Sequence, residues 1–252
     1  AFVPADLRLG EQYVWGLAYL QVANEIKKNI KDETLKSGDM LPSDRVYCEE
    51  LGVSHMTVKK AIDLLANEGL VIRKKGVGTF IAEPKITQSL FTLTGFTGDN
   101  KSPGRETHSK VLNFKEGHPS ADIAKKLMIT EKDSVINLKR LRMINDDIVA
   151  LEDAYINNKN KRYQEIMNHD FERESLYQIL KEKCNVELGL AKETIEVSSA
   201  TEEINMQMEV PLGKPMFYLK RISYNIEEEP IEYVESVYRA DKYIFSAVLT
   251  TQ

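Results

Sequence analysis

The sequence predicts an α+β protein of two folding units, and three observations carry this prediction. The chain has 252 residues, more than most single small domains. Up to residue 82 its apolar residues recur mainly at helical spacing, whereas beyond residue 91 strand-like segments are interleaved with short helical ones. A polar segment containing Pro84 separates the two regions. We therefore predict an extension of unassigned role over 1–18, a first unit over 19–82, a linker over 83–90 and a second unit over 91–252.

The first two helices are predicted from apolar spacing and from a capping residue. Apolar residues three and four positions apart would form one buried stripe along a helix; they are Tyr19, Val22, Ala23, Ile26 and Ile30. A second helix is expected after Pro42, because Ser43 can accept hydrogen bonds from the free N–H groups of a first turn. Its buried side would carry Tyr47, Cys48 and Leu51.

A third helix is predicted directly after a tight turn. Gly52 can adopt the left-handed conformation that such a turn needs, and Ser54 can cap the helix that follows. Two helices joined by a short glycine-containing turn form a helix-turn-helix, whose second helix reaches base edges in the major groove while flanking polar groups contact phosphates. The residues at its leading edge are Ser54, His55, Thr57, Lys59 and Lys60.

A short hairpin is predicted after Gly69, which ends the third helix. Two strand-like segments, 70–73 and 79–81, flank a basic turn that contains two glycines. A hairpin in this place is a wing, so the first unit is predicted to be a winged helix-turn-helix. Its glycines would allow close approach to a DNA groove and its cations would lie beside phosphates. The wing residues expected at DNA are Lys74, Lys75 and Gly76.

The charge distribution is compatible with DNA binding by the first unit alone. The net charge of −5 would argue against a protein that binds a polyanion over its whole surface. Residues 1–80, however, carry 11 Lys and Arg against 11 Asp and Glu, so the acidic excess lies entirely beyond residue 80. Residues 53–80 carry five basic and two acidic side chains, which would concentrate the attraction for phosphates there.

The second unit is predicted to be an α+β domain built on an antiparallel sheet. Strand-like segments cover 110–114, 134–144, 148–156, 195–199, 216–225 and 231–239, and helical patterns lie near 120–128, 175–184 and 201–208. Residues 145–147 and 227–229 are expected to form hairpin turns, although the second turn has no glycine.

Strand alternation places two arginines on an otherwise apolar face of this sheet. Arg140 and Arg142 share that face with Ile136, Leu138 and Ile144. In the segment 148–156, Glu152 lies on the same face as Ala150 and Ala154, and in the segment 231–239, Glu232 and Tyr238 lie on one face. Arginine forks match the oxygens of phosphate and carboxylate groups, so this face suits an anionic, hydroxyl-bearing small molecule. The pattern fits structural ion pairs or a solvated face equally well.

The first unit resembles the DNA-binding domain of GntR-family repressors. The resemblance rests on residues 41–45 (LPSDR), 51–58 (LGVSHMTV), 67–70 (NEGL) and 76–80 (GVGTF). It implies that Arg45 contacts phosphate or base, that the third helix reads the major groove from its start, and that Gly76 enters the minor groove; Ser43 belongs to the same motif. His55 stands where many relatives have arginine, and a histidine cannot bind guanine bidentately.

The second unit resembles the effector-binding UTRA domain of the HutC subfamily. This domain type is similar in fold to chorismate lyase. The matching segments are 93–99, 138–142, 150–152, 175–177 and 230–239. In relatives that bind phosphorylated amino sugars, the matching positions bind the ligand. The resemblance implies that the phosphate is bound by Gly95, Phe96, Thr97, Arg140, Arg142 and Ser175. It implies that the sugar is contacted by Glu152, Tyr177, Glu232 and Tyr238. Ser175 would also cap a helix whose N-terminus favours an anion.

The two alternative functions are those of a chorismate-lyase-like enzyme and of a DNA-binding protein without a ligand. The four histidines show no metal-ligand spacing, and neither a nucleophile motif nor a phosphate-binding glycine loop is present, so no cofactor, metal or catalytic residue is expected. Two distant cysteines indicate a reducing cytoplasm. The sequence therefore predicts a cytoplasmic homodimer that represses a sugar or metabolite utilisation operon. It would bind a palindromic operator under the control of a small anionic effector such as a sugar phosphate.

Overall fold

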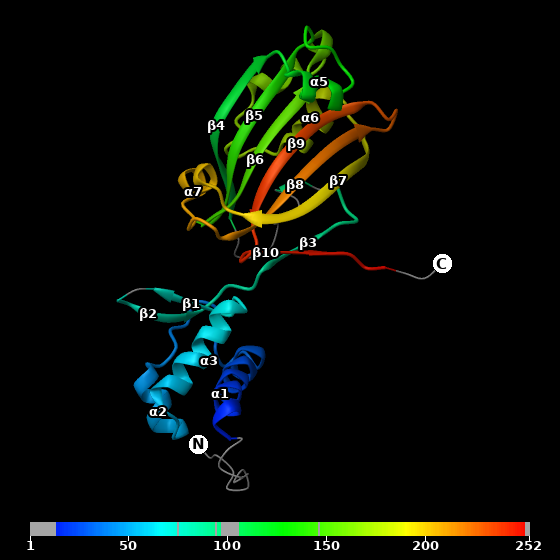
Figure 1. The fold of residues 1–252 in the computed structure, drawn as a ribbon. Helices are drawn as coiled ribbons and strands as arrows, with labels where there is room; N and C mark the ends of the chain where they lie inside the picture. Colours follow the sequence, from blue (N-terminus) through cyan, green and yellow to red (C-terminus); the bar gives the residue numbers. More distant parts are fainter. Residues whose placement is uncertain (1–13, 75, 94, 97–105, 146, 250–252) are drawn as a thin grey trace. The chain divides into compact units, whose positions relative to one another are not determined.

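The computed structural model describes residues 14–74, 76–93, 95–96, 106–145 and 147–249, with the side chains of 14–17 left out of the description. The chain divides into two compact units, one up to Pro84 and one from Lys85 onward (Figure 1). In the described residues no helix is both long enough and apolar enough to cross a membrane.

The first unit is a winged helix-turn-helix. Its elements are α1 (Val14–Lys31), α2 (Asp44–Leu51), α3 (His55–Asn67), β1 (Val71–Lys74) and β2 (Gly78–Ile81). The predicted apolar stripes meet in one core, in which Val22, Ile26, Val58, Ile62 and Leu65 are almost completely buried. Burial of these side chains holds the three helices together.

Two serines and a glycine set the geometry of the helix-turn-helix. The Ser43 hydroxyl accepts the N–H of Val46 at 3.4 Å and begins α2, and the Ser54 hydroxyl accepts the N–H of Thr57 at 3.2 Å and begins α3. Gly52, which ends α2, has a φ of +64°. A side chain with a Cβ rarely adopts this conformation, which explains the glycine at the turn.

The wing is an antiparallel hairpin in which Val71 pairs with Ile81 and Lys74 pairs with Gly78. Gly76, at its tip, is exposed and has a φ of +76°. Lys75, which the sequence analysis places at DNA, lies outside the described residues.

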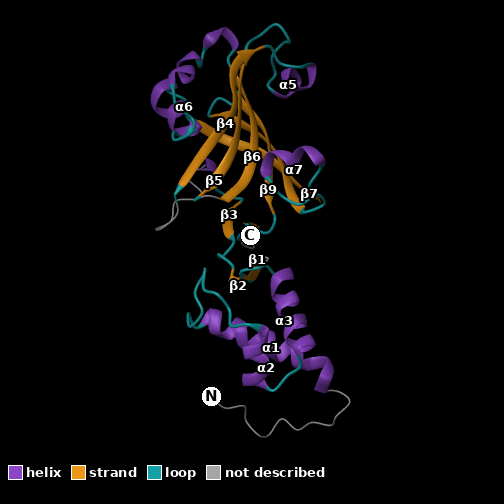
Figure 2. Cartoon of the chain, turned by 90° about the vertical axis from the view of Figure 1, so that its left-hand side faces the viewer, coloured by secondary structure: helices purple, strands orange, loops and turns teal. Residues whose placement is uncertain are grey.

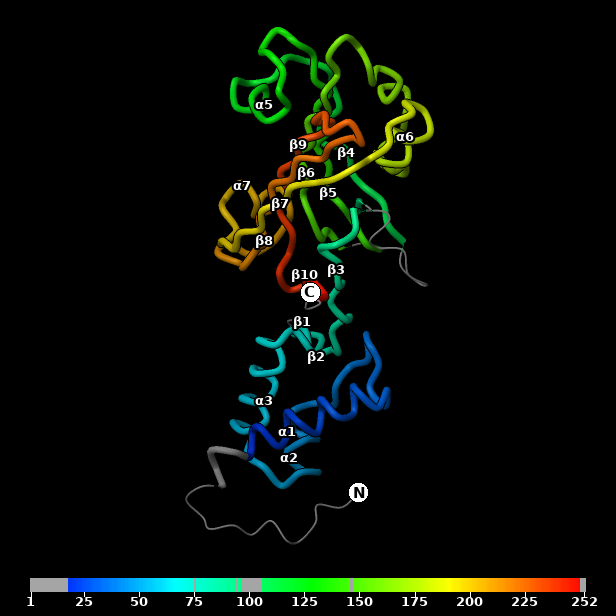
Figure 3. The backbone as a smooth tube through the Cα atoms, turned by 90° about the vertical axis from the view of Figure 1, so that its right-hand side faces the viewer, coloured from blue at the N-terminus to red at the C-terminus, as the bar shows by residue number. Residues whose placement is uncertain are grey.

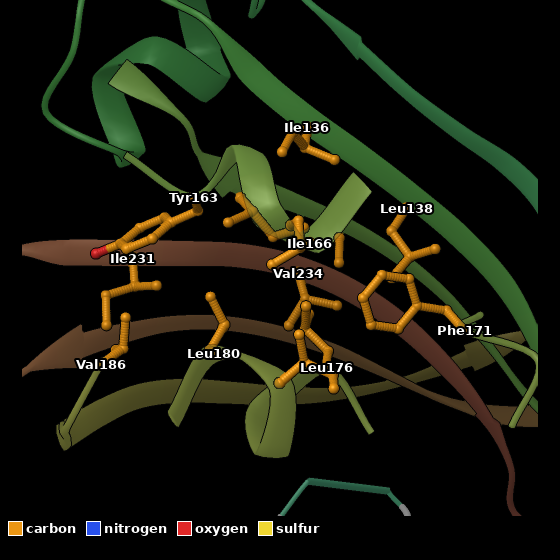
Figure 4. Packing of buried hydrophobic residues seen from close by; sticks show 13 residues of the cluster. Ile136, Leu138, Tyr163, Ile166, Phe171, Leu176, Leu180, Val186, Ile231 and Val234 are labelled. Carbon is orange, nitrogen blue, oxygen red and sulfur yellow. The ribbon is translucent and has the colours of Figure 1, made fainter. Parts of the chain in front are cut away.

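The second unit is built on a six-stranded antiparallel sheet of order β4-β5-β6-β9-β8-β7. The strands are β4 (Thr107–Gly117), β5 (Val135–Ile144), β6 (Asp147–Asn157), β7 (Leu188–Ser199), β8 (Pro215–Asn225) and β9 (Pro230–Arg239). Figure 2 shows α6 (Leu176–Cys184) on one side of the sheet, and α5 (Ala121–Lys126) and α7 (Glu202–Met208) on the other. The larger core cluster lies under α6 and includes Leu138, Ile156, Phe171, Leu176 and Leu180 (Figure 4).

Three segments differ from the sequence prediction. Helix α1 begins at Val14 rather than at residue 19. The sequence does not predict the earlier start, because it offers no capping residue there and Gly16 is a poor helix former. Strand β7 begins at Leu188, well before the predicted 195. Two 3₁₀ helices, Lys159–Lys161 and Gln164–Asn168, were not predicted at all.

The second half of the predicted linker over 83–90 contains a strand. Residues Ile86–Ser89 form strand β3, which pairs in parallel with β10 (Tyr243–Ser246) near the end of the chain (Figure 3). Ile86 and Tyr243 are both buried in this small sheet. The pairing is between segments more than 150 residues apart, so local pattern could not reveal it.

Strands β5 and β6 pair antiparallel on either side of the first predicted turn, in which Asp146 lies outside the described residues. The second predicted turn is present and is formed without glycine. The Asn225 side chain accepts the backbone N–H groups of Glu227 at 3.1 Å and Glu229 at 2.7 Å. Asparagine side chains stabilise turns by such local hydrogen bonds. Glu228 takes the left-handed conformation, with a φ of +61°.

Candidate functional site: a DNA-contacting surface and an arginine-lined pocket

Most predicted DNA-contacting side chains lie exposed on α2, on α3 and on the wing. His55, Lys59 and Lys60 are exposed on α3, and Ser54 is exposed at its cap. Thr57 is an exception, because its side chain is buried and its hydroxyl lies 2.9 Å from the Ser54 hydroxyl. Thr57 therefore helps to shape the start of α3, and only a small part of it faces solvent.

Two side-chain contacts organise the polar groups at the start of the helix-turn-helix. The Arg45 side chain is 87% exposed and its Nε lies 2.8 Å from Glu49 Oε1 one turn along α2. His55 Nε2 lies 3.3 Å from Asp44 Oδ2, which connects the first residue of α3 to the first residue of α2. Because Arg45, Glu49 and His55 are exposed, these contacts can be exchanged for DNA at little cost in folding stability.

In the wing, Lys74 Nζ lies 5.0 Å from the centre of the Phe80 ring. This contact supports the lysine stem while its ammonium group remains exposed. Arg73, in contrast, donates to Asp63 on α3 and to the Lys59 carbonyl, and so ties the wing to the recognition helix.

The second unit contains a pocket over the α6 side of the sheet. Its lining comes from strands β5, β6, β8 and β9, from the start of α6 and from the segment that follows β3. The lining residues are Gly95, Phe96, Arg140, Arg142, Glu152, Ser175, Leu176, Tyr177, Arg221, Glu232 and Val234. All of the sequence-predicted effector residues except Thr97 and Tyr238 are among them. Thr97 lies outside the described residues.

Arg140 and Arg142 share one carboxylate at the floor of the pocket. Arg140 Nη2 donates to Glu152 Oε2 at 3.1 Å, and Arg142 Nε lies 3.4 Å from the same oxygen. Arg140 is only 5% exposed, and its Nε and Nη1 have no hydrogen-bond partner among the residues that the structure describes. Burial, reinforced by the charge of Arg142, lowers the pKa of Arg140 to about 10. The buried donors of Arg140 are therefore available to an anion.

The Glu152 carboxylate is held in its charged form by its neighbours. Burial alone would raise its pKa, but Arg142, Arg140 and Arg221 outweigh burial and place the pKa below its ordinary value. A carboxylate in this state accepts hydrogen bonds and does not serve as a proton donor near neutral pH.

A second group of polar side chains surrounds Glu232. Tyr177 Oη donates to Glu232 Oε2 at 2.7 Å and lies 2.8 Å from Ser223 Oγ, which itself lies 3.3 Å from the same carboxylate oxygen. Burial raises the pKa of Glu232 even though the hydrogen bond from Tyr177 acts in the opposite direction. The pocket thus has a cationic part on β5 and a hydrogen-bonding part around Glu232.

Glu232→Gln is expected to change how stability depends on pH. Because the pKa of Glu232 is raised on folding, its stabilising contribution is complete below about pH 4.3, the ordinary value for glutamate, and is lost as pH rises through the raised pKa. The variant should therefore melt at a higher temperature than wild type at pH 7, with the difference shrinking toward pH 4. Melting curves between pH 4 and 8 check this, and Glu196→Gln on exposed β7 serves as the control. A difference between the two proteins that does not change with pH would contradict the prediction.

Gly95, Phe96 and Ser175 form part of the pocket wall. Gly95 has a φ of +70°, and a Cβ at this position would lie 3.1 Å from Cδ2 of the Tyr177 ring. The neighbouring Phe96 is buried, and the Arg142 guanidinium carbon lies 4.2 Å from the centre of its ring. Ser175 is the N-cap residue of α6, but its side chain makes no capping hydrogen bond, contrary to prediction. Its hydroxyl group and the N-terminus of α6 both belong to the pocket wall.

The structure places Tyr238 differently from the other predicted effector residues. It lies on the same face of β9 as Glu232, but its ring packs edge-on against Tyr243 at 4.8 Å and against Phe245 at 5.8 Å between ring centres. These contacts put it in an apolar cluster with Ile86, Phe96 and Leu219. Tyr238 is thus next to the pocket rather than in its lining.

Sequence reasoning missed Arg221 and Ser223, both on β8. They lie on the pocket face because Arg221 pairs with Val234 and Ser223 pairs with Glu232. The alternation of Leu219, Arg221 and Ser223 was the available signal, of the same kind as that of Arg140 and Arg142. Among the described residues no three His, Cys, Asp or Glu side chains are grouped as a metal ion would require.

Comparison with known proteins identifies both units. Residues 18–81 match the bacterial regulatory proteins of the gntR family, and residues 102–244 match the UTRA domain. The chain is 33% identical over 227 residues to the HTH-type transcriptional repressor NagR of Bacillus subtilis (strain 168), covering 90% of this chain and 92% of that protein. It is 27% identical over 232 residues to a probable fructoselysine utilization operon transcriptional repressor of Escherichia coli (strain K12), covering 92% and 94%.

A solved structure shows the same arrangement of elements. PhnF from Mycobacterium smegmatis is 25% identical, with a TM-score of 0.65 over 92% of this chain and 100% of that chain. Regulators of this family bind DNA operators, and the UTRA domain binds small-molecule effectors. The chain therefore belongs to the GntR family of bacterial transcriptional regulators, with the helix-turn-helix and UTRA architecture of the HutC subfamily, and is a DNA-binding regulator rather than an enzyme.

Proposed function

We propose that this regulator is a homodimeric repressor of a sugar or metabolite utilisation operon, and that a small anionic effector such as a phosphorylated sugar controls its affinity for a palindromic operator. It acts on DNA in the cytoplasm. The carrying observation is Arg140, which is 5% exposed and has two guanidinium nitrogens without a hydrogen-bond partner among the described residues. A buried cation with unused donors is costly unless an anion binds it.

The chemistry of the pocket supports a phosphate group at one end of the effector. Arg140 and Arg142 together carry two positive charges against the single carboxylate that they share, Glu152. Arginine forks fit phosphate oxygens, and the adjacent N-terminus of α6 adds free N–H groups that favour an anion. The hydroxyl-binding group of Tyr177, Ser223 and Glu232 suits the rest of a sugar. The fructoselysine repressor named above regulates use of a sugar derivative, which supports the same class here.

On the DNA side we propose contacts from the exposed polar groups of the first unit. Arg45 on α2 and His55, Lys59 and Lys60 on α3 would meet bases and phosphates, and Lys74 and Gly76 on the wing would meet a neighbouring groove. Two copies of the chain would place two such units on a two-fold symmetric operator. The DNA-binding unit spans 19–82 and the effector-binding and dimerisation unit spans 91–252.

Residues 83–90 would transmit the effect of the ligand, since they join the two units. Strand β3 lies within them, and its Ile86 packs in one cluster with Phe96, whose ring meets Arg142. Effector binding at Arg142 can therefore bias the segment that leads to the DNA-binding unit. This coupling requires that the effector bind the DNA-competent and DNA-free states with different affinity.

Operator selection from random genomic fragments, followed by footprinting and thermal-shift screening, tests the proposal. We expect one two-fold symmetric protected site, and a rise in Tm with sugar phosphates but not with the same sugars without phosphate. The compound that raises Tm should also change operator affinity in a gel shift. A protected site combined with no response to any phosphorylated compound would favour a DNA-binding protein without a ligand.

A further inference from the structure

Arg221 brings a third cation to the pocket, from the opposite side to Arg140. Its side chain is 11% exposed, and its Nε lies 2.8 Å from Glu193 Oε1 on the edge strand β7. Among the described residues Glu193 is the only ion-pair partner of Arg221, and no hydrogen bond is formed by its Nη1 or Nη2. Arg221 belongs to the pocket lining, whereas Glu193 does not. The outer edge of the guanidinium group is therefore neutralised, and its two terminal nitrogens are available to a ligand.

The strand order sets the distance between the backbone of Arg221 and the backbone of Arg140 and Arg142. Arg140 lies on β5 and Arg221 on β8, with β6 and β9 between them. Neighbouring strands lie about 4.8 Å apart, so the two backbones are separated by roughly 14 Å. Glu152 and Val234 line the floor of the pocket between them. Arg221 therefore enters the pocket from a different strand than Arg140 and Arg142.

The carboxylates of the pocket leave the terminal donors of Arg221 unused. Glu152 is held by Arg140 and Arg142 at 3.1 and 3.4 Å, and Glu232 is held by Tyr177 and Ser223 at 2.7 and 3.3 Å. Arg221 forms no ion pair with either carboxylate among the described residues; its charge favours the ionised form of both, although burial keeps the pKa of Glu232 raised. A single arginine fork with free terminal nitrogens matches the two oxygens of a carboxylate.

We propose that the effector has anionic groups at both ends, a phosphate bound by Arg140 and Arg142 and a carboxylate bound by Arg221. The effector class is then a phosphorylated sugar acid or a similar phosphorylated carboxylic acid, rather than a neutral sugar phosphate. This inference rests on the proposed function because it concerns the same effector. It makes Arg221 the residue that selects among phosphorylated compounds.

Two open-chain compounds of equal length test the proposal by calorimetric titration of the full chain. 6-Phosphogluconate carries a carboxylate at the end remote from its phosphate, and glucitol 6-phosphate carries a hydroxymethyl group there. We expect wild type to bind 6-phosphogluconate about tenfold more tightly or better, the usual order of one charge-assisted hydrogen-bond pair. Arg221→Gln should abolish this preference while changing the affinity for glucitol 6-phosphate less than about threefold.

Lys220→Gln is the matched control, since Lys220 is exposed and lies next to Arg221 on the other face of β8, and it should keep the preference. Arg221→Lys, which retains the charge, should keep part of it and guards against misfolding of the glutamine variant. Equal binding of the two compounds by wild type, or equal weakening of both by Arg221→Gln, would overturn this inference and leave the proposed function standing. Wild type that binds neither compound nor inorganic phosphate would overturn both.

Discussion

Arg45→Ala is expected to reduce operator affinity by about 30-fold or more while leaving the melting temperature almost unchanged. One lost arginine contact to a base or phosphate costs about 1–3 kcal/mol, and a symmetric dimer loses two of them. The fold should tolerate the change because Arg45 is 87% exposed and, within the described part of the chain, pairs only with Glu49 on its own helix. Exposed pairs one helical turn apart contribute about 0.3–0.5 kcal/mol. Gel shifts at fixed salt, together with melting curves, measure both quantities.

Glu49→Ala provides the matched control for this variant. It breaks the same ion pair but keeps the arginine, so operator affinity should be retained or slightly increased. The stabilisation of Arg45→Ala by effector should equal that of wild type, because Arg45 and the pocket belong to different units. Wild-type operator affinity in Arg45→Ala would remove this residue from the DNA-contacting surface.

Arg140→Met is expected to have the opposite pattern, with effector affinity reduced about 30-fold or more and operator affinity unchanged in the absence of effector. Removing one partner of a buried charge pair costs about 2–5 kcal/mol of binding, and each 1.4 kcal/mol is tenfold. Arg140 is only 5% exposed and two of its guanidinium nitrogens lack a partner among the described residues. Operator release by effector in a gel shift, with titration calorimetry, measures the loss.

The stability of the ligand-free Arg140→Met protein is an independent part of this prediction. Removing Arg140 leaves no uncompensated buried charge, because Glu152 keeps Arg142 as its partner at 3.4 Å. The melting temperature should therefore not fall. Lys139→Met, on the other face of β5 where Lys139 pairs with Glu203, should leave effector binding intact. An unchanged response of Arg140→Met to effector would refute the assignment of the pocket.

The elements themselves were predictable because their signals are local. Ser43 and Ser54 cap helices, Gly52 permits the tight turn, and the apolar stripes of α1 and α3 repeat at helical spacing. In the second unit, alternation placed Arg140 and Arg142 on one face of β5, and both proved to be buried there. Each of these inferences needs only a few consecutive residues and the geometry of a helix or strand.

What the sequence by itself determined is therefore most of the helices and strands, the family and, within each predicted strand, the face on which a side chain lies. Tertiary structure alone decided which faces meet. The order β4-β5-β6-β9-β8-β7 places Arg221 and Arg140 in the same pocket. The pairing of β3 with β10 places Ile86 and Tyr243 beside Tyr238 in an apolar cluster. Ser175 lies in the pocket lining and its side chain makes no capping hydrogen bond. These outcomes depend on strand neighbours far apart in the chain, and hydrogen bonding between strands carries no local sequence signal of its partner.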